Sequence, residues 1–299
     1  MTPNARGSVK LADAASALIS SLSTRLTHED LLAEAGHDVR IITARRNRDI
    51  LVVGKHYGAV YVNHDGWLLR YKILHDGSRQ IIDFILPGQI FGLQACLFRN
   101  ALYSVAAITE SSLSEIPFEM IDNVFERSPR LAKALFWSAV SETAIVGEHL
   151  IDAARRSAYE RISHLLLELF VRLKGAGLTN DMSFVLPLTQ ELIGDALGLT
   201  TVHVNRTIRS LREDKLIAID HKRVTILDFE ALCMISDFEN SYLGSAADAV
   251  GRKVNLPRRD APEQPRLAPE TGTQSHVRRQ ANLTGDAKAR RVTGAPARP

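Results

Sequence analysis

The chain has 299 residues, of which 45 % are hydrophobic and 24 % are charged, and its formal net charge at pH 7 is +3. This composition is ordinary for a soluble globular protein, and the length exceeds what one ordinary domain needs. No run of about eighteen apolar residues occurs, which excludes a membrane-spanning helix, and the N-terminus lacks the apolar core of a signal peptide. We therefore expect a cytoplasmic protein.

The cysteines and histidines give no sign of a metal site. Cys96 and Cys233 form no Cys-x-x-Cys pair, so neither a disulfide framework nor a zinc knuckle is expected. None of the ten histidines lies at metal-ligand spacing from a Cys, Asp or Glu. The sequence therefore predicts neither a metal nor another cofactor.

Residues 1–26 are expected to be a flexible lead-in, with a helical segment as the alternative. From about residue 40 to residue 114 the chain has short apolar runs at a spacing of roughly ten residues, broken by turn signals. The clearest runs are 50–53, 59–62, 67–71 and 81–85. Asp76-Gly77 supplies the positive φ of a tight turn, so residues 67–85 are predicted to form a hairpin. This pattern is typical of a sandwich, roll or barrel.

A long helix is predicted for residues 128–156. Small and large side chains follow one another at spacings of four and three along one stripe: Ala132, Phe136, Ala139, Thr143, Val146, Leu150 and Ala153. Such a stripe allows the close approach of a second helix, as in a coiled coil, and about 25 residues reach about 37 Å. We expect this helix to form a homodimer seam. The alternative is an amphipathic helix that lies on the β domain.

A second domain is predicted to begin with a new helix. Ser157 and Glu160 have the spacing of a capping box, and the apolar residues Ile162, Leu165, Leu166 and Leu169 follow it. Glycines after Lys174 end this helix. From residue 244 to 299 the chain is rich in Arg, Pro, Ala and Gly, which predicts a disordered tail. Its Arg-Arg pairs are either weak DNA contacts or simply solvated.

Residues 188–227 predict a winged helix-turn-helix. Thr189 caps a short helix with apolar residues on one face, and Gly198 allows the tight turn after it. Thr200 caps a second helix, whose inward side chains are Val204, Ile208 and Leu211. Residues 217–226 read as a hairpin. The sequence therefore predicts a two-helix DNA-binding unit followed by a wing.

The outward face of the second helix has side chains that suit DNA. Arg can bond guanine in bidentate fashion, Asn can do the same for adenine, and the basic tip of the wing suits phosphates. The residues predicted to contact DNA are Thr189, Thr200, Thr201, Val202, His203, Asn205, Arg206, Arg209, Lys222 and Arg223. The alternative is a three-helix unit with a solvated polar face.

The order of these segments resembles the Crp/Fnr transcription regulators. Residues 86–92 (LPGQIFG) are similar to the turn before the family's effector-binding cassette, and residues 155–162 (RRSAYERI) to its hinge. The resemblance covers about residues 27–240. It implies an α+β protein with a cyclic-nucleotide-binding-like β-roll at 27–127, a dimerisation helix at 128–156 and a winged helix-turn-helix at 157–240. It also implies a homodimer that binds a palindromic operator, with RNA polymerase as a further candidate partner.

Two departures from the family concern the effector. In members that bind cyclic AMP, a Gly-Glu pair holds the ribose and an Arg before Ser or Thr holds the phosphate. Here Leu93 follows Gly92, and Tyr103 precedes Ser104. These four residues are the candidates for lining an effector pocket. Without the Arg and the Glu the pocket lacks partners for the phosphate and the ribose, so we expect that cyclic AMP does not bind.

Other sensors of the family fit less well. No cysteine precedes Cys96, which excludes the N-terminal iron–sulfur cluster of the oxygen-sensing members. His56, His64 and His75 are available to haem, but nothing separates them from turn residues. Two modes of control therefore stay open: an unidentified effector in the roll that shifts the hinge near Ser157, or a protein that is constitutively competent.

The recognition helix also departs from the family. Many relatives have Glu where this chain has Val202, which can offer only apolar contact, for example to a thymine methyl. The chain keeps the family's Arg as Arg206, with Asn205 beside it. We therefore expect a DNA half-site that is altered at the base pair that the Glu would read.

Two other classes of protein are alternatives to a DNA-binding regulator. A cyclic-nucleotide-dependent module that binds a protein would share the roll but would not explain residues 189–226. An enzyme is disfavoured because the chain has no P-loop, nucleophile elbow, dinucleotide fingerprint or zinc-protease motif.

Overall fold

A computed structural model of the chain describes residues 38–243, apart from the side chains of residues 122, 123 and 125. The segments 1–26 and 244–299, expected to be a flexible lead-in and a disordered tail, lie outside these residues. All the described residues belong to one compact unit of the chain. No described helix is long and apolar enough to cross a membrane.

The N-terminal β domain consists of two antiparallel sheets. Its strands are β1 (Arg40–Ala44), β2 (Asp49–Leu51), β3 (Ala59–Asp65), β4 (Leu68–Ile73), β5 (Arg79–Ile85), β6 (Ile90–Phe91), β7 (Ser104–Ala107) and β8 (Ser111–Pro117). In the described part of the chain they form two four-stranded sheets, with the orders β1-β8-β3-β6 and β2-β7-β4-β5. Leu68 and Val105 of one sheet and Phe91 and Leu113 of the other share one buried cluster. The domain is therefore a roll closed around an apolar core, as expected.

The predicted hairpin is formed by β4 and β5. Leu69 pairs with Phe84, and the ladder shifts by one residue between Arg70 and Tyr71. At the turn, the Asp76 carboxylate accepts from the Ser78 backbone N–H at 2.9 Å, and Gly77 has a φ of +83°. The Asp-Gly signal thus located this turn correctly.

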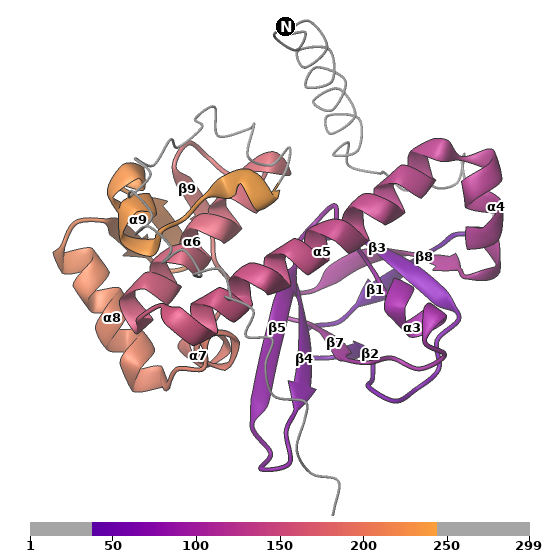
Figure 1. Cartoon of the computed structure of the whole chain (residues 1–299), viewed down its shortest axis with the longest axis horizontal. Helices are drawn as coiled ribbons and strands as arrows, with labels where there is room; N and C mark the ends of the chain where they lie inside the picture. Colours follow the sequence, from indigo (N-terminus) through magenta and orange to yellow (C-terminus); the bar gives the residue numbers. More distant parts are fainter. Residues whose placement is uncertain (1–37, 244–299) are drawn as a thin grey trace, which may run out of the picture. The chain divides into compact units, whose positions relative to one another are not determined.

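Three described helices lie beside the roll (Figure 1): α3 (Leu93–Leu97), α4 (Glu119–Arg127) and α5 (Pro129–Arg155). Ser128 caps α5, because its hydroxyl accepts from the Leu131 N–H at 3.2 Å, and Pro129 takes the first position, where no donor is lost. The side chains of α5 buried in this chain include Leu131, Leu135 and Ile145.

Most of the predicted seam stripe is exposed in this chain. Phe136 and Leu150 of this stripe are 68 % and 69 % exposed. The stripe is therefore largely exposed, although Ala132 packs on a buried cluster of the roll and Ala139 and Thr143 line a pocket beside it. Helix α5 also lies on the roll as an amphipathic helix would, because Leu131 and Leu135 are buried in a cluster with Val60 and Ile116.

The C-terminal domain begins where the capping box was predicted. The Ser157 hydroxyl accepts from the Glu160 N–H at 3.3 Å, and the Glu160 carboxylate accepts from the Ser157 N–H at 2.6 Å. This backbone hydrogen bond lowers the pKa of Glu160. The elements that follow are α6 (Ala158–Gly175), β9 (Ser183–Val185), α7 (Gln190–Leu197), α8 (Thr201–Glu213), β10 (Ile217–Asp220), β11 (Arg223–Ile226), α9 (Phe229–Ser236) and the 3-10 helix η1 (Asn240–Leu243).

Apolar packing holds the C-terminal domain around α6. Phe170 of α6 contacts Phe184 of β9 and Phe229 of α9, with ring centroids 6.0 and 6.1 Å apart. The sheet order β10-β11-β9 adds a third strand to the predicted wing hairpin. Cys96 and Cys233 are buried free thiols, and burial raises their pKa values to about 11 and about 12. Neither is a reactive thiolate at neutral pH.

A buried polar cluster joins α5 to α6. His149 of α5 has its Nε2 3.0 Å from the Glu168 carboxylate and its Nδ1 2.9 Å from the Ile82 carbonyl oxygen. Both partners are acceptors, so both ring nitrogens must carry protons, and the imidazole is cationic. Arg172 donates to the second Glu168 oxygen at 2.8 Å and to Asp83 at 3.0 Å. Every charge in the cluster therefore has a partner.

The cluster shifts the titration of His149. Burial opposes its protonation, but the Glu168 charge and hydrogen bond outweigh burial and raise the pKa of His149 from 6.5 to about 9. Burial likewise opposes ionisation of Glu168, but His149 and Arg172 hold the pKa of this carboxyl well below its usual range.

We predict that His149 makes stability fall at alkaline pH. Because its pKa is higher in the folded chain than in the unfolded chain, its contribution is complete below pH 6.5 and is lost as the pH rises through about 9. Denaturant titrations should show that the wild type loses about 2–3 kcal/mol more than His149→Gln between pH 6 and pH 10. Parallel losses in the two proteins would contradict this ionisation, because all other titrating groups are common to both.

Candidate nucleic-acid interface

Helices α7 and α8 form the predicted helix-turn-helix. The Thr189 hydroxyl accepts from the Leu192 N–H at 3.2 Å and the Thr200 hydroxyl accepts from the His203 N–H at 3.3 Å, so both threonines cap the helices that the sequence assigned to them. The turn between the helices is tight. A Cβ on Gly194 would lie 2.5 Å from the Leu199 carbonyl oxygen, and Gly198 has a φ of +65°. A side chain at position 194 would therefore clash with the backbone, and position 198 has the left-handed conformation that glycine adopts most readily.

Helix α8 has one buried and one exposed face. Val204 and Leu211 are fully buried, and Ile208 is partly buried against the same core. The predicted contact residues of this helix are exposed: Thr201, Val202, His203, Asn205, Arg206 and Arg209. Val202 is 72 % exposed, so its side chain is free to make contacts on this face.

The polar side chains of this face are partly pre-oriented. The Asn205 amide donates to the Gln190 side-chain oxygen at 3.2 Å, and Arg209 donates to Glu213 at 2.8 Å. Gln190 was not among the predicted contact residues. Its position next to the Thr189 cap was the only available signal, and only the packing of α7 against α8 brings it to Asn205.

The wing places two basic residues at its tip. His221 has a φ of +52°, which closes the tight turn between β10 and β11, and Lys222 and Arg223 beside it are exposed. The Lys222 carbonyl accepts from the Leu186 N–H at 2.7 Å, so the turn is tied to the segment after β9. This hydrogen bond therefore holds the turn that carries the basic tip of the wing.

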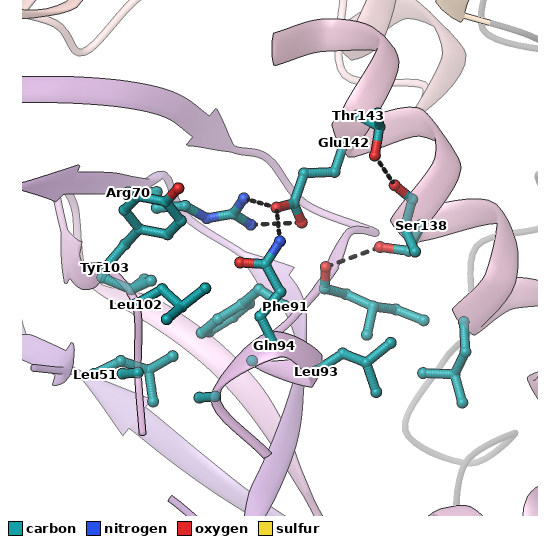
Figure 2. A pocket seen from close by; sticks show the side chains of 17 residues that line it. Leu51, Arg70, Phe91, Leu93, Gln94, Leu102, Tyr103, Ser138, Glu142 and Thr143 are labelled. Carbon is teal, nitrogen blue, oxygen red and sulfur yellow. Dashed lines mark hydrogen bonds and ion pairs between the residues drawn. The ribbon is translucent and has the colours of Figure 1, made fainter. Parts of the chain in front are cut away.

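A pocket lies between the roll and α5 (Figure 2). Gly92, Leu93 and Tyr103 line it, but Ser104 does not: its hydroxyl accepts from the Val53 N–H at 3.0 Å. Gly92 has a φ of +93°, and a Cβ there would lie 3.1 Å from the Tyr61 ring. Three of the four candidate effector-pocket residues therefore line the same pocket. The backbone conformation at position 92 requires glycine.

The pocket's cation already has an anionic partner. Arg70 of β4 forms a two-pronged ion pair with Glu142 of α5, and the Gln94 amide donates to the same carboxylate at 2.8 Å. A cyclic phosphate here would meet the negative charge of Glu142 and would find Arg70 engaged. The residues present therefore do not fit a cyclic nucleotide. Arg70 and Glu142 lie 72 residues apart, and nothing in the sequence pointed to their pairing.

Comparisons with known proteins match both halves of the chain. Residues 42–128 match the family model of a cyclic nucleotide-binding domain, and residues 160–235 match that of a Crp-like helix-turn-helix domain. The chain is 33 % identical to the nitrogen fixation regulation protein FixK of Rhizobium meliloti, over 64 % of this chain and 85 % of that protein. It is 30 % identical to the transcriptional activator protein Anr of Pseudomonas aeruginosa, over 61 % of this chain and 75 % of that protein.

Solved structures share the fold. The structure of FixK2 from Bradyrhizobium japonicum superposes with a TM-score of 0.58 at 24 % identity, and the match covers 67 % of this chain and 98 % of that one.

We predict that Arg206→Ala loses about 1–3 kcal/mol of specific DNA binding, because the variant lacks the bidentate donor for a guanine. Fluorescence anisotropy on a duplex that the wild type selects, and on a scrambled duplex, measures this loss. Arg45→Ala is the matched control, since it removes the same charge from an exposed turn of the roll. Equal affinities of Arg206→Ala and wild type would show that the recognition helix is misassigned.

Proposed function

Because the chain belongs to the Crp/Fnr family of transcription regulators, we propose that it binds a two-fold palindromic operator as a homodimer. The proposal assigns residues 27–127 to the roll, 128–156 to the dimerisation helix and 157–240 to the DNA-binding domain. The role involves no catalysis, and a cytoplasmic location goes with a DNA target. RNA polymerase is a partner only if the protein activates transcription.

The observation that carries this proposal is the exposed face of α8. Asn205 and Arg206 project from the first two turns of the helix, where a recognition helix meets base edges. Lys222 and Arg223 on the wing provide phosphate contacts beside it. Val202 lies on the same exposed face and would contact a thymine methyl. One surface thus combines base-reading groups, an apolar contact and phosphate partners.

The exposed stripe on α5 supports the dimer. A soluble chain gains free energy by covering exposed Phe136 and Leu150, and Ala139 and Gly147 on α5 are small enough to let a second helix approach. A two-fold axis along this seam would place two recognition helices on one face of the DNA. Half-sites about 34 Å apart, one turn of DNA, would then be read together.

We predict that the purified protein, with no ligand added, enriches a palindrome from random duplex DNA at near-physiological salt. Affinity for the enriched site should fall steeply as salt rises, because phosphate contacts release counterions. Phe136→Glu is expected to give a folded monomer that binds this site far more weakly, since its side chain is exposed within one chain. Enrichment of a single, non-repeated half-site would contradict the dimer.

We predict that cyclic AMP gives no binding heat in calorimetry at concentrations on the order of 1 mM. The reason is the pocket's charge: Glu142 neutralises Arg70, and Leu93 offers no acceptor for a ribose hydroxyl. Tight binding would overturn this reading of the pocket.

A further inference from the structure

The pocket of the roll is bounded by two parts of the chain. Leu51, Arg70 and Phe91 belong to the roll, whereas Ser138 and Glu142 belong to α5. Any group bound there touches both parts. Helix α5 leads through residues 156 and 157 into α6, and His149 of α5 contacts Glu168 of α6, so the contact of α5 with the roll is connected to the DNA-binding domain.

The chain itself supplies such a group. The carboxylate of Glu142 enters the pocket from α5, and each of its oxygens meets one terminal nitrogen of Arg70, with Nη2 to Oε2 at 2.9 Å (Figure 2). The Gln94 amide of α3 adds a third donor at 2.8 Å. The side chains of Arg70 and Glu142 are only 8 % and 19 % exposed. One carboxylate therefore receives donors from β4 and α3 in a largely buried site.

Two other contacts hold the same face of α5. The Ser138 hydroxyl donates to the Ile90 carbonyl oxygen at 3.0 Å, and His149 reaches the Ile82 carbonyl oxygen at 2.9 Å. Positions 138, 142 and 149 are four and seven residues apart, so they share one helix face. Glu142 lies between the two outer contacts and has the only charge that enters the pocket from α5 within its described lining.

We propose that Glu142 is a built-in ligand of the roll: its carboxylate occupies the anion site at Arg70 and fixes α5 for DNA binding without a small-molecule effector. This inference rests on the proposed DNA-binding function. A free carboxylate or phosphate would have to displace Glu142 from Arg70 and leave a second anion in the same cavity. The wild-type pocket is therefore closed to small anions, and Glu142 has a positioning role.

Truncation of the side chain makes the proposal testable. Glu142→Ala frees Arg70 and opens a space that acetate fits. With the full-length protein and the duplex selected by the wild type, we expect Glu142→Ala to lose about tenfold in affinity, within the usual range of coupling between two sites. Acetate at tens of millimolar, against chloride at equal ionic strength, should restore most of this loss. Acetate should change neither the wild type nor Arg70→Met/Glu142→Ala.

The controls separate this role from general damage. Glu110→Ala removes the same side chain from an exposed position of the roll and should bind DNA as the wild type does. If Glu142→Ala fails to fold, Glu142→Gln keeps the size and loses the charge. It should bind DNA more weakly, with no rescue by acetate, because the amide still fills the space. Wild-type affinity in Glu142→Ala without acetate would overturn the proposal, as would a gain in wild-type affinity from added phosphate or acetate.

Hydrogen exchange on the DNA-free protein gives an independent reading. Amides of residues 138–146 should exchange faster in Glu142→Ala than in the wild type and slow again with acetate. Equal rates in the two proteins would overturn the built-in ligand even if no DNA site is ever found. If the exchange rates change as expected but the protein selects no DNA, only the proposed DNA-binding function is contradicted.

Discussion

Every described part of this protein depends on the two-sided character of helix α5. One face is fixed to the roll by Ser138, Glu142 and His149, and the other leaves Phe136 and Leu150 exposed, where we propose that a second copy packs. A helix with only one such face would serve either the roll or the dimer. Because α5 has both, the position of the roll, the proposed dimer axis and the start of the DNA-binding domain are linked through one rigid element.

Buried charged side chains lie where α5 contacts the roll and where it contacts α6. At these contacts the helix needs a defined orientation as well as a stable attachment. Apolar packing holds each domain together, and an ion pair with additional donors adds geometric specificity to it. Arg70 with Glu142, and His149 with Glu168 and Arg172, are such groups. The first pair joins the roll to α5, and the second group joins α5 to α6.

The DNA-binding half was predictable in detail because its signals are local. Thr189, Ser157 and Thr200 cap the helices assigned to them, Gly198 turns between α7 and α8, and Val204 and Leu211 are buried as their spacing required. For the roll, the sequence predicted the class of fold and one hairpin but missed the two-residue strand β6. In the DNA-binding domain it missed the three-residue strand β9. Strands that short have no periodicity to detect, and pairing with distant partners alone defines them.

The sequence by itself determined the kinds of elements, the caps, the exposed stripe of α5 and the contact face of α8, because each depends on residues within a few turns of one another. Only the tertiary structure decided which polar side chains meet. Arg70 and Glu142 are 72 residues apart, and Gln190 reaches Asn205 across two helices. Such pairs leave no trace in local spacing, since the energy that selects them arises only after the roll, α5 and the DNA-binding helices have packed and excluded water.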